Sequence, residues 1–416
     1  MRYSSPADDR VKLLLLRPVE VGLRPDLLRI AIVTEFFPPY VFGGGELNRY
    51  YVAKALVGRG HVVDVFCHRS FGAPKEEMIE GVRVHRLGVS VDAASLHAVR
   101  LYSVLELLRR FGGRFDLVDI SFFVPYVPAF LLAAVRKIPV VTTVHDIFSP
   151  HWVETKGPVW GPIGYGLEWT DLLLARTSRQ VITVSDTVVQ KLVRLGIQRK
   201  KIRLCYNGVD LSLTDSLRER RSETPLALAV TRFVKYKHPE HVVLAWRRVI
   251  ESVRGARLVM IGTGPLLEYC RGLARAVGLE DSVNIMGPVE RHEDVLRWMS
   301  KAWVLAHAST VEGFGLVLVE ANACCTPYVA YGVPAVREVT RLTEGGLTVS
   351  PMDRDGLARG LVEVLNDVNL RKQLGTTGRR HIERSLTWDH VAARTEEAYF
   401  EALNQRQMRS MFDPGL

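Results

Sequence analysis

The stretch that decides the fold runs from residue 303 to residue 320 and reads WVLAHASTVEGFGLVLVE. Residues 303–306 form a short apolar run, which is typical of a buried strand in a parallel sheet. A polar loop that contains Glu312 follows, and we expect a helix from Phe314 onward. The stretch therefore has the strand–loop–helix order of an α/β protein.

The same order recurs through both halves of the chain. In the first half, short apolar runs predict strands at residues 29–35, 61–66, 116–120, 140–144 and 181–184. In the second half, they predict strands at residues 226–230, 257–261, 283–286, 303–306 and 328–330. Helical patterns lie between these runs, so the sequence predicts two parallel, doubly wound sheets.

The length of the chain also indicates two domains. A chain of 416 residues exceeds the roughly 250–300 residues that one hydrophobic core usually serves. Turn residues at 206–210 and a polar segment at 214–224 predict the boundary. We expect an N-terminal extension at residues 1–28 and a first Rossmann-like domain at 29–206, which a C-terminal helix at 388–412 joins. The second domain is expected at residues 207–387.

Composition and charge narrow the function classes. The net charge of +10 suits anionic partners, but the basic residues are spread along the chain and no nucleic-acid-binding motif is present. The five cysteines have no zinc-site spacing, which favours reduced thiols in the cytoplasm. The longest apolar run, residues 124–135, is interrupted by Pro125 and Pro128 and is too short to span a bilayer. We therefore expect a cytoplasmic protein without a nucleic-acid partner, and any membrane contact to be peripheral.

The glutamate motif in the opening stretch carries the strongest chemical signal. Free N–H groups at the start of a helix bind phosphate or hydroxyl oxygens, and Glu312 before the helix can bind sugar hydroxyls. Glu320, two turns further on, can reach a ribose diol. The alternative is an ordinary capped helix with Glu320 on its solvated face, but a cap does not require Gly313 and Gly315 on both sides of Phe314.

Together with the Ala-Cys-Cys-Thr-Pro run at residues 323–327, this motif resembles the retaining family-four glycosyltransferases, known as glycosyl transferases group 1, which have the GT-B fold. Their signature is two glutamates separated by seven residues around Gly-Phe-Gly, followed by a run like Ala-Cys-Gly-Thr-Pro. Cys325 stands where the family usually has glycine. The resemblance extends from about Arg29 to Leu403.

The resemblance implies two facing domains, with the final helix crossing back to the first domain. The first domain would hold the acceptor and the second the nucleotide-sugar donor. The implied reaction is a retaining, metal-independent hexosyl transfer without a cofactor, in which the nucleotide sugar is a co-substrate and the leaving phosphate takes the acceptor proton. Glu312 would position the sugar and stabilise positive charge at its anomeric carbon.

Arg232 and Lys237, which follow the first strand of the second domain, form the second signal. Fixed cations stabilise the negative charge that develops on a leaving nucleotide. The resemblance implies that this pair holds the donor diphosphate. Without it, a solvated basic loop is an equal interpretation.

Glycine-rich loops after two strands form a weaker signal, because such loops are common in Rossmann-like folds. They let the backbone approach a ligand closely. The resemblance implies donor contacts from both loops and from the glutamate motif, at Gly44, Gly45, Gly262, Gly264, Phe314, Gly315, Leu316 and Glu320.

His145 and Asp146 end the predicted strand at residues 140–144. The resemblance implies that His145 reaches the transferred sugar. The alternative is a histidine that only forms hydrogen bonds at the end of a strand.

Asp353-Arg354-Asp355 matches the Asp-x-Asp metal motif of a different transferase class. Asp355 precedes the helical run at residues 356–365, and Asp is a preferred helix N-cap. We interpret this motif as a cap, so no catalytic metal is implied.

Residues 148–169 are rich in aromatic residues and include Trp152, Trp160 and Trp169. Ordinary packing beneath a long loop is one interpretation, and an acceptor-side surface near lipid headgroups is the other. Under the second interpretation, the acceptor is a glycan or a lipid-linked saccharide at an anionic membrane surface.

Two alternative functions remain for the whole chain. They are a GT-B sugar-nucleotide epimerase and a non-catalytic sugar-nucleotide-binding subunit.

Overall fold

The structure is a computed structural model that describes residues 27–39, 43–70, 72–91, 115–122, 126–149 and 151–412. Two compact units divide the chain. The larger unit comprises Val144–Trp169 and Thr183–Arg394. The smaller unit comprises the preceding chain up to Thr143, Thr170–Ile182, and the chain from Thr395 onward. The predicted extension at residues 1–28 lies outside the described residues except for its last two positions.

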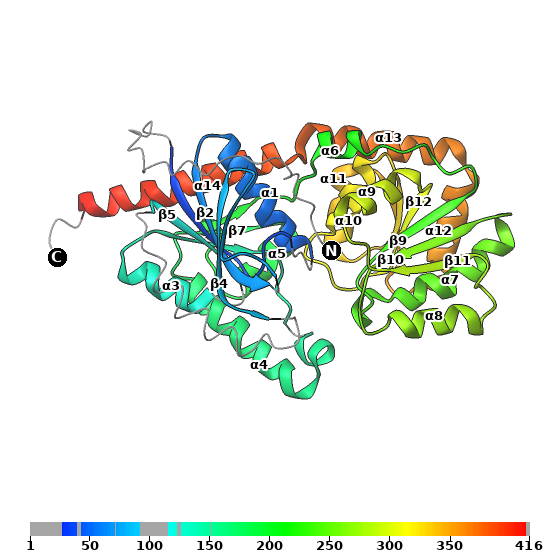
Figure 1. Ribbon diagram of the computed structural model, residues 1–416, viewed down its shortest axis with the longest axis horizontal. Coiled ribbons are helices and arrows are strands. Elements are labelled where there is room, and N and C mark those ends of the chain that lie inside the picture. The colour runs from blue at the N-terminus through cyan, green and yellow to red at the C-terminus, as the bar shows by residue number, and fades with distance from the viewer. Residues whose placement is uncertain are drawn as a thin grey trace. The chain divides into compact units, whose positions relative to one another are not determined.

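The larger unit contains a six-stranded sheet (Figure 1). Its strands are β9 (Leu226–Val230), β10 (Arg257–Ile261), β11 (Val283–Gly287), β12 (Val304–His307), β13 (Tyr328–Tyr331) and β14 (Gly346–Val349). They lie in the order β11-β10-β9-β12-β13-β14, and all five neighbouring pairs are parallel. Counted from β9 this is the order 3-2-1-4-5-6 of a doubly wound Rossmann sheet, which confirms the predicted fold class.

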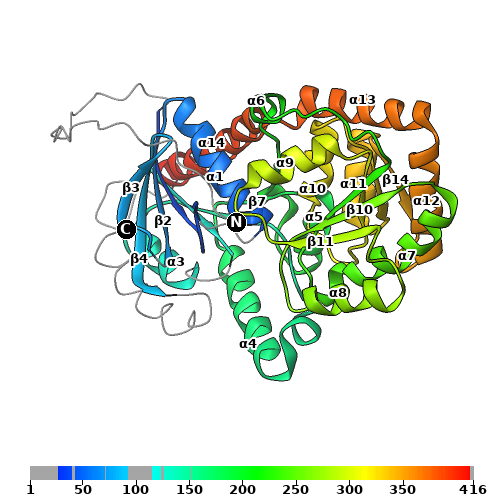
Figure 2. The same cartoon turned by 45° about the vertical axis from the view of Figure 1, so that its right-hand side comes forward.

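Helices cover both faces of this sheet (Figure 2). One face carries α7 (Pro239–Ser252), α8 (Leu267–Ala276) and α12 (Arg354–Asn366). The other carries α9 (His292–Lys301), α10 (Leu316–Ala323), α11 (Pro334–Thr343) and α13 (Val368–Ser385). Successive strand residues serve opposite cores: Ala227 and Ala229 pack with Trp246 of α7, whereas Leu226 and Leu228 pack on the other face. Both faces are buried, which is why these strands appear in the sequence as continuous apolar runs.

An eight-stranded sheet begins in the smaller unit. Its strands are β1 (Arg29–Val33), β2 (Val62–Ser70), β3 (Glu76–Ile79), β4 (Val82–Val91), β5 (Leu117–Ser121), β6 (Val140–Val144), β7 (Gln180–Thr183) and β8 (Ile202–Leu204). Their order is β3-β4-β2-β1-β5-β6-β7-β8. β1 pairs in parallel with β2 and β5, β2 with β4, and β5 with β6.

The edge strand β3 departs from the predicted parallel arrangement, because it runs antiparallel to β4. Glu80 and Gly81 join the two strands and both have positive φ, at 49° and 81°. A type I′ hairpin turn needs positive φ at both central residues, and such a turn joins adjacent antiparallel strands directly. This hairpin was not predicted from the sequence.

The remaining helices among the described residues are α1 (Gly44–Gly58), α3 (Tyr126–Val135), α4 (Trp152–Ala175), α5 (Asp186–Arg194), α6 (Leu211–Ser216) and α14 (Trp388–Phe412). From Thr395 onward α14 belongs to the smaller unit, where the Tyr399 hydroxyl donates to Asp119 Oδ2 at 2.6 Å. Within the described ranges, no helix combines the length and the apolar character that crossing a membrane would require.

Candidate active site

The order of the six strands places two predicted loops side by side. β9 and β12 are neighbours in the sheet, and the order of the strands reverses between them. In doubly wound sheets, ligands bind at the carboxyl ends of the strands at such a switch point. Arg232 and Lys237 follow β9, and Glu312 follows β12, so the topology brings together residues about 75 positions apart.

Glu312 is the centre of the charged group at this point. Its Oε1 accepts a close hydrogen bond from Lys237 Nζ and another from His307 Nε2 at 2.8 Å. The side chains of Glu312 and Lys237 keep only 10% and 13% of their exposure. Burial alone would raise the pKa of Glu312, but the Lys237 charge and the His307 hydrogen bond outweigh burial and hold it well below its ordinary value. The carboxylate is therefore ionised at neutral pH.

The second oxygen of Glu312 is in a different position. Both hydrogen bonds go to Oε1, and Oε2 has no hydrogen-bond partner within the described part of the chain. Oε2 can therefore accept a hydrogen bond from a ligand hydroxyl, or face a developing positive charge.

Tyr236 organises the two cations after β9. Arg232 Cζ lies 5.6 Å and Lys237 Nζ 5.5 Å from the centre of its ring, within the range of cation–π attraction. Arg232 also donates a close hydrogen bond to the Tyr236 hydroxyl. The Tyr236 carbonyl accepts from Thr310 N at 2.8 Å and so joins this loop to the Glu312 loop. Tyr236 was not predicted, although the sequence shows an aromatic residue between two basic ones.

Gly262 and Gly264 support the Arg232 loop. Their φ angles are 144° and 149°, and a Cβ at Gly262 would lie 1.8 Å from the Thr231 carbonyl oxygen. A Cβ at Gly264 would lie 2.5 Å from the Phe233 carbonyl oxygen. Both positions therefore require glycine, because the loops after β9 and β10 are in close contact. The predicted donor contacts of these glycines remain a prediction.

The helix of the glutamate motif begins two residues later than expected. Gly315 is the N-cap of α10 with φ 96°, and Leu316 is its first residue. Phe314 is only 3% exposed and lies 5.9 Å, ring to ring, from Tyr206. The Phe314 side chain therefore anchors the loop in the core, and the N–H groups at the start of α10 can meet a ligand.

Glu320 lies on the buried side of α10, at 8% exposure. The alternative interpretation that placed it on a solvated helix face is therefore wrong. Its Oε1 lies 2.9 Å from Nε2 of His292, the first residue of α9. Burial lowers the pKa of His292, but the charge of Glu320 outweighs burial and raises it above the ordinary value. Each glutamate of the motif thus has a buried histidine partner, and neither histidine was predicted.

His145 and Asp146 lie against the same motif, inside the larger unit. A Cβ at Gly313 would lie 2.3 Å from the His145 carbonyl oxygen, so this position also requires glycine. Asp146 Oδ1 accepts from Lys191 Nζ of α5 at 2.8 Å. Burial raises the pKa of Asp146 even though Lys191 acts to lower it. Lys191 was not predicted, because its pairing appears only in the fold.

Two other predicted positions lie in the smaller unit, and their donor contacts remain a prediction. Gly44 and Gly45 begin α1 after β1, in the smaller unit. Cys325, which stands where the similar family usually has glycine, has φ 55°, in the left-handed region that favours glycine.

The interpretation of the Asp-x-Asp motif needs a correction of two residues. The N-cap of α12 is Asp353, whose Oδ1 accepts from Gly356 N at 2.7 Å. Asp355 lies inside the first turn and is 3.7 Å from Arg248. A capping role for this motif is therefore confirmed, with Asp353 in place of Asp355.

Comparisons with known proteins give two family matches. The family described as Glycosyl transferases group 1 matches residues 216–381, and the one described as Glycosyltransferase Family 4 matches residues 42–213. The GDP-mannose-dependent alpha-(1-6)-phosphatidylinositol monomannoside mannosyltransferase of Mycobacterium tuberculosis is 30% identical over 387 residues. This match covers 88% of the present chain and 96% of that protein.

Solved structures show the same fold. Sucrose-phosphate synthase from Thermosynechococcus elongatus superposes with a TM-score of 0.74 at 22% identity, over 91% of this chain and 100% of that one. HepE of Anabaena, solved in complex with UDP-glucose, superposes with a TM-score of 0.69 at 18% identity, with the same coverage of both chains. Both likenesses support two Rossmann-like α/β domains. The chain therefore belongs to the glycosyltransferase family described as Glycosyl transferases group 1 and has the GT-B fold.

Proposed function

We propose that this glycosyltransferase transfers a sugar from a nucleotide-sugar donor with retention of anomeric configuration and without a catalytic metal. The observation that carries the proposal is the group of Glu312, Lys237 and Arg232 at the switch point between β9 and β12. A carboxylate with one uncommitted oxygen suits a sugar whose anomeric carbon becomes positive. Two adjacent cations suit the diphosphate that leaves.

The chemistry assigns a role to each side chain. As the glycosidic bond breaks, the anomeric carbon gains positive charge and Glu312 Oε2 stabilises it. The diphosphate oxygen takes the bonding electrons, and Arg232 and Lys237 neutralise the charge that develops there. The same phosphate then takes the proton of the acceptor hydroxyl, which attacks from the same face. His145, at the end of β6, positions the transferred sugar, and Glu320 holds the ribose diol.

Donor binding is the first test. A nucleotide sugar that binds the folded chain raises its melting temperature by mass action. A thermal-shift screen with GDP-mannose, UDP-glucose and related donors should find at least one that stabilises the wild type and stabilises Arg232→Ala less. NMR of the product then gives the anomeric configuration. If no nucleotide sugar raises the melting temperature or is consumed, the proposal fails.

Analysis of the products formed from the donor that binds separates the alternative functions. An epimerase converts the nucleotide sugar without an acceptor, whereas a transferase releases the nucleotide and forms a new glycosidic bond. A binding subunit is stabilised by the donor but never consumes it. The proposal requires nucleotide release that rises when an acceptor is added.

For the acceptor we propose a lipid-linked saccharide at the cytoplasmic face of an anionic membrane. The mycobacterial relative supports a lipid-linked acceptor, because its name specifies a phosphatidylinositol mannoside. Helix α4 supports membrane contact, since it carries a set of large hydrophobic side chains that are at least 40% exposed: Val153, Val159, Trp160, Ile163, Tyr165, Leu167 and Leu173. Such a side-chain set, together with a net charge of +10, suits an anionic lipid surface.

The aromatic residues of α4 divide into two kinds. Trp152 has a structural role, because its indole N–H donates to Glu168 at 3.1 Å and its ring packs against Phe148 and Gly164. Trp160 is 49% exposed and is therefore the residue to test for membrane contact. The packing interpretation thus holds for Trp152.

Flotation with anionic vesicles tests membrane contact. We expect the wild type to float at low salt and to be released at high salt, because screening shortens electrostatic attraction. Trp160→Ala should float less, whereas Tyr269→Ala, which removes an aromatic ring 57% exposed on α8, should behave as the wild type. A wild type that never floats would overturn the membrane half and leave the transferase assignment intact.

A further inference from the structure

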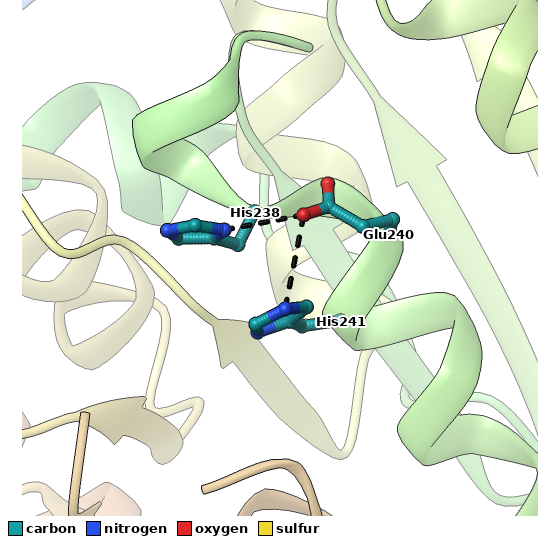
Figure 3. A group of neighbouring side chains, drawn as sticks. All are labelled: His238, Glu240 and His241. Atoms are coloured by element: carbon teal, nitrogen blue, oxygen red, sulfur yellow. Dashed lines mark hydrogen bonds and ion pairs between the residues drawn. The ribbon is translucent and has the colours of Figure 1, made fainter. Parts of the chain in front are cut away.

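Next to the loop after β9, three side chains with metal-binding atoms converge. His238, Glu240 and His241 lie at the start of α7, directly after Lys237. One ligand atom from each lies within 4.8 Å of the others. Figure 3 shows both imidazoles beside the same carboxylate oxygen of Glu240. The motifs recognised in the sequence do not include this group.

The distances between the histidine nitrogens and the carboxylate oxygen are close to those between the ligand atoms of a bound metal ion. His238 Nδ1 lies 3.1 Å and His241 Nε2 3.8 Å from Glu240 Oε1. Zinc binds imidazole nitrogen and carboxylate oxygen at about 2.0–2.2 Å, so ligand atoms at tetrahedral angles lie roughly 3.3–3.6 Å apart. The first pair has nearly this separation, and the second reaches it when the His241 ring moves by less than an ångström and turns toward the carboxylate.

The outer contacts of both histidines also match a metal site. Metal-binding histidines usually use their second ring nitrogen in a hydrogen bond that fixes the ring. His238 Nε2 lies 3.2 Å from the Thr310 hydroxyl, and His241 Nδ1 lies 2.9 Å from the Tyr331 hydroxyl. In both histidines the nitrogen nearer to Glu240 is the one left for an ion.

Two further features favour an ion over a simple hydrogen-bonded cluster. Glu240 Oε2 is buried and has no hydrogen-bond partner outside its own residue within the described ranges. His238 has φ 44° and ψ 51°, in the left-handed region that a histidine seldom adopts. A side chain that closes a metal site compensates for an unfavourable backbone, whereas a solvent-facing one does not.

We propose that His238, Glu240 and His241 bind one Zn²⁺ ion, with water in the fourth position. Two imidazoles and one carboxylate suit zinc better than magnesium or calcium, which prefer oxygen ligands. Thr310 follows β12 and Tyr331 ends β13, so the ion would tie the loop after β9 to the ends of two neighbouring strands. Its role is structural. It fixes the backbone next to Lys237 and supplies no group to the reaction, and it therefore does not depend on the proposed function.

Zinc binding is measured directly on the full-length protein stripped of metal. Equilibrium dialysis with metal analysis should give one Zn²⁺ per chain at micromolar free zinc, and Co²⁺ in its place should give visible absorption from the bound ion. Glu240→Gln and His241→Ala should each weaken zinc binding at least tenfold. His381→Ala, which removes a histidine of α13 outside the cluster, should leave it unchanged.

A milder pair of variants keeps the test decisive if a ligand variant fails to fold. Tyr331→Phe and Thr310→Val keep all three ligands and remove only the outer hydrogen bonds, which typically weakens metal binding about 10- to 100-fold. The proposal is overturned if the wild type binds no zinc, if Glu240→Gln binds it equally well, or if Mg²⁺ binds as tightly.

Discussion

Each unit contains a buried carboxylate that pairs with a cation, and the two carboxylates differ in how the protein occupies their oxygens. In the smaller unit, Asp119 on β5 is fully buried and pairs with Arg49 Nη1 at 2.8 Å. It also accepts from the Thr143 hydroxyl at 2.7 Å and the Tyr399 hydroxyl at 2.6 Å. Both oxygens of Asp119 are therefore occupied by protein groups.

In the larger unit, Glu312 also pairs with a cation, but its bonds all go to one oxygen. It lies in a loop at the carboxyl end of a strand and keeps 10% of its side-chain exposure, whereas Asp119 keeps none. A buried ion pair alone is weak evidence of function. What distinguishes the two is the oxygen that Glu312 leaves for a ligand.

The largest effect we expect is on stability, from Asp119→Ala. Removing one partner of a buried ion pair leaves an uncompensated charge, here Arg49, and typically costs about 3–5 kcal/mol of the free energy of unfolding. Urea denaturation followed by circular dichroism measures this loss. An Asp119→Ala protein as stable as the wild type would show that Asp119 is not structural, and the distinction drawn between Asp119 and Glu312 would be wrong.

The next effect is on catalysis, from Glu312→Ala. Loss of one preorganised contact to the transition state typically costs about 2.7–4 kcal/mol, or roughly 100- to 1000-fold in rate. The free energy of unfolding should change much less than in Asp119→Ala, because water can reach Lys237 once the carboxylate is gone. Steady-state kinetics on the folded variant checks this, and near-normal turnover would disprove the role of Glu312.

Substitutions of the two cations should have smaller effects, and the two substitutions should differ in their effect on stability. Lys237→Ala and Arg232→Ala should each slow transfer, because each removes a charge from the proposed diphosphate site. Lys237→Ala should also destabilise the fold, since it leaves Glu312 without its cation, whereas Arg232 is exposed and its loss should leave stability unchanged. Kinetics and urea denaturation of both variants test this. Equal stabilities for the two variants would mean that the Lys237–Glu312 contact is not a true ion pair.

The buried His292–Glu320 pair makes a still smaller, pH-dependent contribution. The pKa of His292 is raised in the folded chain, so its stabilising charge is fully present below the ordinary histidine pKa of about 6.5 and is lost as pH rises through the folded value. Glu312 has the opposite sign: its pKa is depressed, so its contribution is lost only as pH falls below its ordinary range.

The difference in unfolding free energy between the wild type and Glu320→Gln, measured against pH, isolates the histidine contribution. It should shrink as pH rises above about 6.5. A difference that stays constant up to pH 9 would show that His292 is not charged in the fold.

The sequence predicted the six-stranded sheet better than it predicted the site. Strands such as β9 and β10 are buried on both faces, so continuous apolar runs mark them with correct ends. The hairpin of β3 and β4 was missed, because β3 is short, two of its four residues are glutamates and none of them is buried. β14 was missed as well, because only its first residue is fully buried.

Within the site, the motif identified Glu312 and Glu320 but not the residues that hold them. His307, His292 and Lys191 carry no motif, and their roles depend on contacts between loops and helices far apart in the chain. The cap of α12 was placed two residues too late, because Asp353 and Asp355 have the same capping chemistry and only the backbone distinguishes them. Pattern alone thus selects the candidate site residues, and tertiary structure is needed to find their partners.

The last prediction is that an added divalent metal ion does not change the rate of transfer, and it tests whether fixed cations replace a metal. Arg232 and Lys237 lie in the loop after β9, and the proposed function gives them the work that a divalent ion does in other transferases. The Asp353 side chain, which belongs to the Asp-x-Asp motif, caps a helix. Adding Mg²⁺ or Mn²⁺ to the metal-stripped enzyme should therefore leave kcat unchanged, in the wild type and in Glu240→Gln alike. Zinc is measured separately, because the proposed zinc site acts on the fold and not on the diphosphate. Activity that disappears with a chelator and returns with manganese would show that a metal, and not this pair of cations, neutralises the leaving group.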